Sequence, residues 1–217
     1  MKKDVIKATV LSTKIIPNVD PALAHALQLP TYVKSLGLIT TDSDDVTYVA
    51  LDEATKVADV EVVYAKSLYA GAANASTKLA GEIIGILGGP SPAEIRSGLE
   101  MAVQVVESEA HFISANEDNS IIYFAHTISR TGSYLSKAVN SSVGTAIAYL
   151  IAPPLESIYG LDAAMKAADV AMGVMYNPPS ETNFGGALLT GSQSACRAAC
   201  DAFAQAVENI ADAPLAY

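Results

Sequence analysis

The chain contains an internal repeat, which limits the possible folds more than any other feature of the sequence. Residues 51–60, LDEATKVADV, line up with residues 161–170, LDAAMKAADV, at a shift of 110 positions, and seven of the ten residues are identical. Two alanine-rich helices would share alanines by chance, but these segments also share leucine, aspartate, lysine and valine in register. The chain is therefore expected to fold as two copies of one module.

The match continues on both sides of this segment. The further pairs are residues 36–39 with 148–151, 62–64 with 174–176, and 81–88 with 185–191. An alanine-rich helical pattern then follows in each copy, at residues 93–107 and 194–208. We predict two domains of the same kind, residues 1–113 and 114–217.

Hydrophobic spacing in the first copy predicts a series of short elements. In chain order they are a strand at 35–40, a helix at 51–58, strands at 60–64 and 82–87, and a helix at 93–107, while strand-like stretches at 5–16 and 121–129 precede the two copies. Ser91 as N-cap and Pro92 at the first helical position mark the start of the last helix. This order predicts an α+β fold, in which a small antiparallel sheet carries helices on one face.

The balance of apolar and charged residues restricts the class of protein. Apolar residues make up 51% of the chain and charged residues 17%, whereas an ordinary soluble domain carries about 25% charged residues. Intrinsic disorder is excluded because it requires low hydrophobicity. Much of the surface is expected to be buried against other subunits.

The net charge and the apolar runs bear on compartment and partners. Thirteen basic residues against 23 acidic residues give a net charge of −10, which argues against nucleic acid as a partner and favours small cations. No apolar run approaches the ~18 residues that a membrane helix needs. Asp4 and Lys7 interrupt any signal-peptide core. The protein is expected to stay inside the cell and away from the membrane.

The two cysteines, Cys196 and Cys200, lie four residues apart in a helical pattern. This spacing puts their Cβ atoms about 5–6 Å apart, whereas a disulfide needs about 3.5–4.5 Å. We expect reduced, packed thiols. A zinc pair is the alternative, but no His or further Cys stands at ligand spacing, so we predict no metal site.

Several long strings of the sequence resemble one known family. They lie at residues 35–39, 42–48, 62–73, 129–135, 152–156 and 179–183. On these strings the chain resembles the bacterial microcompartment shell family, in its form with two tandem, circularly permuted domains, and within it the members that serve ethanolamine utilisation. The resemblance implies a homotrimer that forms a pseudohexameric disc and tiles with other shell proteins into the shell of a microcompartment in the cytoplasm. It implies a structural protein without catalytic activity or cofactor.

The repeated lysines, Lys56 and Lys166, match the lysine with which the resembled family makes contacts at the edge of the disc. The alternative is an ordinary solvated lysine on each helix. The presence of the lysine in both copies, where flanking residues differ, favours the edge role.

Acidic residues crowd into one turn of the first copy, at Asp42, Asp44 and Asp45. Like charges repel, so the cluster is stabilised when a cation or a donor sits among them. A calcium loop is excluded because Val46 and Thr47 occupy positions that need a ligand and a glycine. The alternative is an aspartate-rich turn that caps a helix.

The second copy lacks these acids. Its corresponding stretch is residues 152–156, APPLE, and Glu82 of the first copy aligns with Gly186. Both modules should share structural requirements, whereas a ligand site need not recur. The contrast favours a functional acidic patch in the first module.

The resemblance assigns a role to this patch. It implies a small pore within each subunit, in which Asp44, Asp45, Glu82 and Phe112 bind ethanolamine, a protonated amine held by charge-assisted hydrogen bonds. The alternative for Phe112 is ordinary core packing.

Two turn-rich stretches, residues 65–80 and 177–184, follow the same strand in their copies. Connections longer than about 12 residues are usually functional or mobile. The resemblance implies that these loops open and close a central pore, with pore residues at Ser67, Leu68, Tyr69, Ala70, Gly71, Asn74, Pro179, Ser180, Glu181, Thr182 and Asn183. The alternative is a pair of plain surface loops.

Signatures of catalysis are absent or poor in the sequence. No Gly-Lys-Ser/Thr follows the glycines of residues 81–89, and there is no Gly-x-Ser-x-Gly motif. His25, His111 and His126 are scattered. Two other functions remain open at this point, a regulator that binds a small cation as effector and, less favoured, an enzyme whose site forms between modules.

Overall fold

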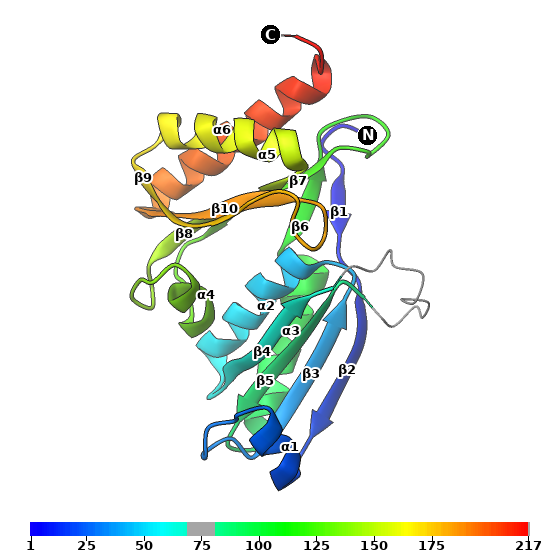
Figure 1. The fold of residues 1–217 in the computed structure, drawn as a ribbon, viewed down its shortest axis with the longest axis vertical. Coiled ribbons are helices and arrows are strands. Elements are labelled where there is room, and N and C mark those ends of the chain that lie inside the picture. Colours follow the sequence, from blue (N-terminus) through cyan, green and yellow to red (C-terminus); the bar gives the residue numbers. More distant parts are fainter. Residues whose placement is uncertain (69–80, 217) are drawn as a thin grey trace. The chain divides into compact units, whose positions relative to one another are not determined.

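The computed structural model describes residues 1–68 and 81–216 (Figure 1). Its elements in chain order are β1 (Val5–Lys7), β2 (Val10–Ile16), α1 (Pro21–Ala26), β3 (Ser35–Thr41), α2 (Asp44–Val57), β4 (Glu61–Ser67), β5 (Ile83–Gly89), α3 (Pro92–Ser108), β6 (His111–Ser114), β7 (Ile122–Ile128), α4 (Ser133–Ala138), β8 (Ala146–Ala152), α5 (Pro154–Ala167), β9 (Val170–Tyr176), β10 (Gly185–Gly191) and α6 (Gln193–Asp212). They form two compact units.

The first unit consists of Lys7–Ala110 together with Gly132–Leu135. Its sheet is antiparallel with the strand order β2-β3-β5-β4. Helices α2 and α3 pack against each other and on the strands of this sheet. The predicted α+β arrangement is confirmed in this unit.

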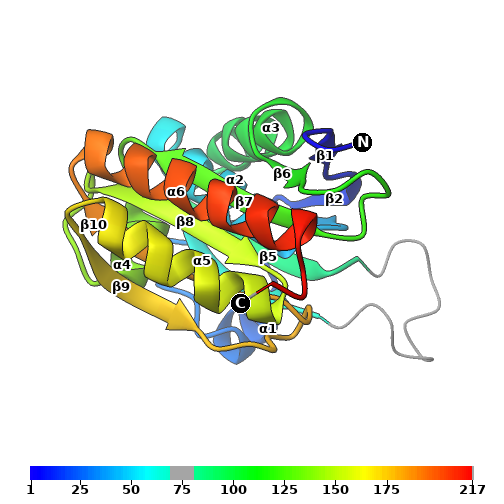
Figure 2. The same ribbon diagram turned by 90° about the horizontal axis from the view of Figure 1, so that it is seen from above.

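The second unit consists of Met1–Ile6, His111–Thr131 and Ser136–Tyr217. Its sheet has the order β1-β6-β7-β8-β10-β9, so β7, β8, β10 and β9 repeat the order of the first sheet, and β1 with β6 extends it. Helices α5 and α6 lie side by side over this sheet (Figure 2). The predicted duplication is thus visible in the topology.

The two units differ from a division by chain order. The sequence repeat places the boundary after residue 113, whereas contacts group Met1–Ile6 with the later residues and Gly132–Leu135 with the earlier ones. Gly132–Leu135 thereby lies with the first unit, where it is hydrogen-bonded to helix α2.

Strand pairing corrects the alignment of the two copies at one place. Gly37 faces Leu87 in the first sheet, and Ala148 faces Leu189 in the second, so Gly37 is the structural counterpart of Ala148. The sequence comparison aligned Leu36 with Ala148, which is wrong by one residue. Because side chains alternate along a strand, that shift would exchange the buried and exposed faces.

Helix α2 begins at Asp44, seven residues before the predicted start at residue 51. Two of the acidic residues that suggested a turn, Asp44 and Asp45, instead occupy the first helical turn, where negative charge is favourable because of the helix dipole, while Asp42 lies before the N-cap. The N-cap of α3 was predicted correctly, because the Ser91 side chain accepts a hydrogen bond from the Glu94 N–H.

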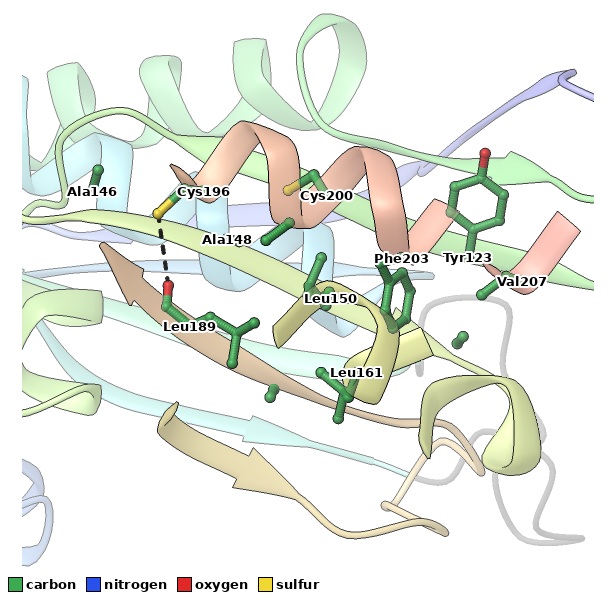
Figure 3. Packing of buried hydrophobic residues seen from close by; sticks show 14 of the residues in the cluster. Tyr123, Ala146, Ala148, Leu150, Leu161, Leu189, Cys196, Cys200, Phe203 and Val207 are labelled. Atoms are coloured by element: carbon green, nitrogen blue, oxygen red, sulfur yellow. Dashed lines mark hydrogen bonds between the residues drawn. The ribbon is translucent and has the colours of Figure 1, made fainter. Parts of the chain in front are cut away.

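The core of the second unit lies between its sheet and α6 (Figure 3). Cys196 and Cys200 are buried in it as free thiols, which confirms the prediction for the cysteines. Burial raises the pKa of both thiols, that of Cys200 to about 11. Within the described ranges, no helix has the length and hydropathy that crossing a bilayer requires.

Candidate acidic site and subunit surfaces

The predicted acidic residues come together in the first unit. Asp44 and Asp45 open helix α2 with exposed fractions of 8% and 6%, and Glu82 lies immediately before β5, partly buried. The backbone places them there because β3 runs directly into α2 and the Glu82 N–H donates to the Thr41 carbonyl at the end of β3. The strand end, the helix start and the next strand therefore meet at one point.

The pKa of Glu82 reports how close these charges are. Burial raises it first, and the charges of Asp44 and Asp42 raise it further, to about 7. A carboxyl group with a pKa near 7 changes its charge in the physiological range. The negative charge of the site therefore changes with pH around neutrality, through Glu82.

The acids do not act as a conventional helix cap. The N-cap of α2 is Ser43, whose side chain makes no capping hydrogen bond. Asp42 instead accepts a hydrogen bond from the Thr9 N–H at 2.6 Å, and Asp44 accepts one from the N–H of Asp45 at 2.9 Å. Asp44 and Asp45 therefore lie inside the first helical turn and not at the N-cap position.

The second repeat lacks the acids, as expected, but one counterpart differs from the sequence alignment. Helices α2 and α5 have the same length, so Asp44 and Asp45 correspond to Pro154 and Leu155. Ile83 faces Thr41 and Gly185 faces Ala152 at matching strand positions, so Glu82 corresponds to Phe184. The alignment of Glu82 with Gly186 was wrong, because the loop before β10 is shorter.

Two further residues of this site, Tyr48 and Ser67, connect it to the loop between β4 and β5, which the sequence predicted to be a pore loop. The Tyr48 hydroxyl lies 2.6 Å from the Ser67 Oγ at the end of β4. Burial raises the pKa of Tyr48, the Ser67 hydrogen bond opposes this, and the charges of Asp44 and Asp45 raise it further. The sequence indicated no role for Tyr48, because an aromatic residue on a helix normally reads as core.

The loop between β4 and β5, the first of the two predicted pore loops, is described only at its ends. The Leu68 N–H donates to the Glu82 carbonyl at 2.6 Å, which closes the base of the loop beside the acids. Tyr69, Ala70, Gly71 and Asn74 lie outside the described residues.

The loop between β9 and β10, the second of the two predicted pore loops, forms a turn held by its own backbone. The Ser180 N–H donates to the Phe184 carbonyl at 2.7 Å, and the Asn183 N–H donates to the Ser180 carbonyl at 3.1 Å. Asn183 has a φ of +67°, a left-handed conformation that asparagine tolerates. A role of Pro179, Ser180, Glu181, Thr182 and Asn183 in a pore stays a prediction.

Phe112 belongs to the second unit, where it is buried. Its ring centroid lies 5.2 Å from that of Phe124 and 5.9 Å from that of Phe184. These contacts account for its burial as core packing, and its part in the amine site stays a prediction.

The two repeated lysines have different surroundings. Lys56 pairs with Glu53, its side chain is 24% exposed, and the Asp52 carboxylate lies 3.9 Å from its Nζ. Lys166 is well exposed and pairs with Asp162 at 2.6 Å. A role in edge contacts stays a prediction for both.

A buried carboxylate fixes the segment Gly132–Leu135 onto α2. Asp52 has no exposed surface and accepts hydrogen bonds from the N–H groups of Gly132 at 2.6 Å and Leu135 at 2.8 Å. A Cβ at position 132 would collide with Thr55 Oγ1 and the Asp52 backbone, so this position requires glycine. Burial raises the pKa of Asp52, while the backbone donors and Lys56 oppose the rise.

The first repeat caps its own equivalent turn differently. Helices α1 and α4 correspond, and the Asp20 side chain accepts from the N–H groups of Ala22 and Leu23 at the start of α1. At the start of α4 the same position is Gly132, and Asp52 supplies the carboxylate from another helix. Asp162, the counterpart of Asp52, is 61% exposed on α5.

This duplicated architecture matches a known domain. The BMC domain family matches residues 35–121, which run from β3 to the loop after β6. The class is thereby defined as a protein of tandem BMC domains.

Full-length relatives narrow the class. The chain is 64% identical over 217 residues, covering 100% of both chains, to the bacterial microcompartment shell protein EutL of Clostridium perfringens, and 53% identical over 212 residues to EutL of Salmonella typhimurium, covering 98% of this chain and 97% of that one. The crystal structure of the ethanolamine utilization protein EutL from Leptotrichia buccalis has a TM-score of 0.97 at 64% identity, covering 100% of both chains. The chain belongs to the EutL family of bacterial microcompartment shell proteins.

Proposed function

We propose that the protein is a trimeric, pseudohexameric tile in the shell of an ethanolamine-utilisation microcompartment and that its acidic site binds protonated ethanolamine. The observation that carries the binding role is the cluster of Asp44, Asp45 and Glu82 in one repeat only. Carboxylates hold an ammonium group by charge-assisted hydrogen bonds. The two pore loops are proposed to gate a central pore.

The surface of α5 supports assembly with further copies. On α2, the corresponding face is covered by Gly132–Leu135. On α5, apolar side chains remain exposed, namely Leu155, Ile158, Tyr159 and Met165. An exposed apolar face of this kind marks an interaction surface. Contact of this face with a different face of another copy would be heterologous, and such contacts form a ring when the rotation between copies closes.

Replacing the three acids tests the binding role. The variant Asp44→Asn/Asp45→Asn/Glu82→Gln keeps the shapes but removes the charges, so ethanolamine binding measured by calorimetry should weaken at least about tenfold. Trimer mass in solution should not change. Asp162→Asn, a carboxylate outside the site, is the matched control. Unchanged affinity in the triple variant would sink the assignment.

The binding should also depend on pH through Glu82. The pKa of this group is raised to about 7, so below pH 7 the site is protonated at this position and a cation must displace the proton. Affinity for ethanolamine should therefore rise from pH 6 to pH 8 and then level off, with protons released on binding at pH 6.5. Calorimetry in two buffers of different ionisation enthalpy measures the release, and Glu82→Gln should abolish it.

The edge lysine is best tested at Lys166, because Lys56 also stabilises buried Asp52. Lys166→Ala should reduce the extent of two-dimensional sheets seen by negative-stain electron microscopy and leave the trimer intact. Loss of the trimer would contradict the edge role. If the unaltered protein forms isolated trimers and no lattice, the result would instead favour a cation-sensing regulator.

A further inference from the structure

The acidic site has an aromatic neighbour that the binding role above does not use. Tyr134, from the segment Gly132–Leu135 of the first unit, stacks on Tyr48 of α2 with ring centroids 6.1 Å apart and an interplanar angle of 28°. The Tyr48 hydroxyl lies 2.6 Å from the Ser67 Oγ, and the strand partner of Ser67 is Ile83, the residue after Glu82. The charges of Asp44 and Asp45 also raise the pKa of Tyr48. Tyr48 therefore lies close to the carboxylates.

The two repeats differ at both positions of this aromatic pair. The counterpart of Tyr48 on α5 is Ile158, at the same position of a helix of equal length. The counterpart of Tyr134 is Ala22, because α4 and α1 both have six residues and Ser133 corresponds to Pro21. Tyr48 of the first repeat and Tyr134 of the second repeat thus each have a non-aromatic counterpart in the other copy.

Core positions behave in the opposite way. Leu51 and Leu161 are both buried, and so are Val106 and Val207 at corresponding positions of α3 and α6. A requirement of the fold is met in both repeats, whereas each of these tyrosines is replaced by an aliphatic residue at its counterpart. The packing of the module therefore does not by itself require tyrosine at either position.

The chemistry of the pair suits an organic cation. An ammonium group near the face of a tyrosine ring is attracted by the ring quadrupole, in addition to its hydrogen bonds with carboxylates. The methylene groups of a small amino alcohol also lose apolar surface to water when they contact a ring. An inorganic cation is attracted only weakly by the ring quadrupole, and it has no methylene groups to bury against the ring.

We propose that Tyr48 and Tyr134 form the aromatic wall of the amine site and that Asp52 is the positioning residue that holds Tyr134 there. Asp52 fixes the amides on either side of Tyr134, those of Gly132 and Leu135, from a fully buried carboxylate. Thr55 adds a third contact by accepting from the Ser133 N–H at 3.0 Å. This inference rests on the proposed binding of ethanolamine.

Calorimetry with ethanolamine at pH 8 and constant ionic strength tests the wall. Tyr134→Ala, which installs the residue of the other repeat, should weaken binding roughly three- to tenfold, whereas Tyr134→Phe should stay within about twofold because the ring face remains. Tyr64→Ala, at an exposed tyrosine on β4, is the matched control and should bind as the unaltered protein. Potassium chloride as a probe should show no difference between Tyr134→Ala and the unaltered protein.

The positioning role needs a readout that general destabilisation would not give. Asp52→Asn should weaken ethanolamine binding, but the double variant Asp52→Asn/Tyr134→Ala should bind no more weakly than Tyr134→Ala alone, because both changes remove the same contact. Asp162→Asn is the control. If Asp52→Asn does not fold, Thr55→Ala replaces it in the same cycle.

The outcomes separate this inference from the proposed function. If the unaltered protein binds ethanolamine and the triple amide variant does not, but Tyr134→Ala binds normally, the aromatic wall is wrong and the acidic site stands. If the effects of Asp52→Asn and Tyr134→Ala add, Asp52 is not the positioning residue. Absence of ethanolamine binding by the unaltered protein overturns both.

Discussion

Replacing Asp52 by alanine should lower the free energy of unfolding of the first unit by about 3 kcal/mol, because the N–H groups of Gly132 and Leu135 lose their acceptor in a buried place. The loss is large because Asp52 has no exposed surface and its two hydrogen bonds are short, at 2.6 and 2.8 Å. The segment that carries Tyr134 would also lose the cap at the start of α4.

Hydrogen exchange read residue by residue by NMR measures this effect locally, which suits a protein of two units better than a single melting temperature. The amides of Gly132 and Leu135 should exchange much faster in Asp52→Ala. Asp162→Ala removes the counterpart carboxylate on α5, which is exposed and pairs with Lys166. This change should lower the free energy of unfolding by less than about 1 kcal/mol. Equal losses in the two variants would contradict the assigned role of Asp52.

Phe203→Ala should destabilise the second unit by about 3–5 kcal/mol, the usual cost of removing a large buried side chain together with the cavity that it leaves. Phe203 is fully buried on α6 and belongs to the core cluster with Leu150 and Leu161 (Figure 3). Its ring packs where α5 has Gly160, since a Cβ there would lie 2.7 Å from the ring. The corresponding residues of the first repeat are Ala50 and Ala102.

In a double-mutant cycle, the effect of Gly160→Ala on the free energy of unfolding should change sign when Phe203 is replaced. In the unaltered protein, Gly160→Ala should destabilise by about 1–3 kcal/mol, because the added methyl group overlaps the ring. In the Phe203→Ala background the same change should stabilise by up to about 1 kcal/mol, since the overlap is gone and alanine favours a helix over glycine. Urea unfolding measures all four proteins. A Gly160→Ala effect of the same sign in both backgrounds would contradict this packing.

Local patterns explain most of what could be predicted about the fold. The duplicated segment around Lys56 and Lys166 predicted two modules, and hydrophobic spacing predicted the order of strands and helices along the chain. Strand and helix periodicities are properties of a few consecutive residues, so they survive without knowledge of the partner elements. The start of α2 was missed because Asp44 and Asp45 suit both a turn and the first turn of a helix.

The acidic site was predicted in part. Asp44, Asp45 and Glu82 were found because their charges are absent from the second repeat, a contrast that the sequence displays directly. The counterpart of Glu82 was misidentified, since loops of unequal length before β5 and β10 shift the alignment and only strand pairing restores it. Glycine-rich strands offer little pattern by which to detect such a shift.

The sequence by itself determined that the chain is a duplicated α+β module, that its cysteines pack as thiols in a helix, and that only one copy carries the acids. These follow from composition and from spacing within single elements. Only the tertiary structure decided that Asp52 is buried and holds a segment 80 residues further along the chain, and that this segment brings Tyr134 to Tyr48. The physical reason is that a carboxylate on a helix face has the same local pattern whether water or a distant backbone amide satisfies it, as Asp52 and Asp162 show.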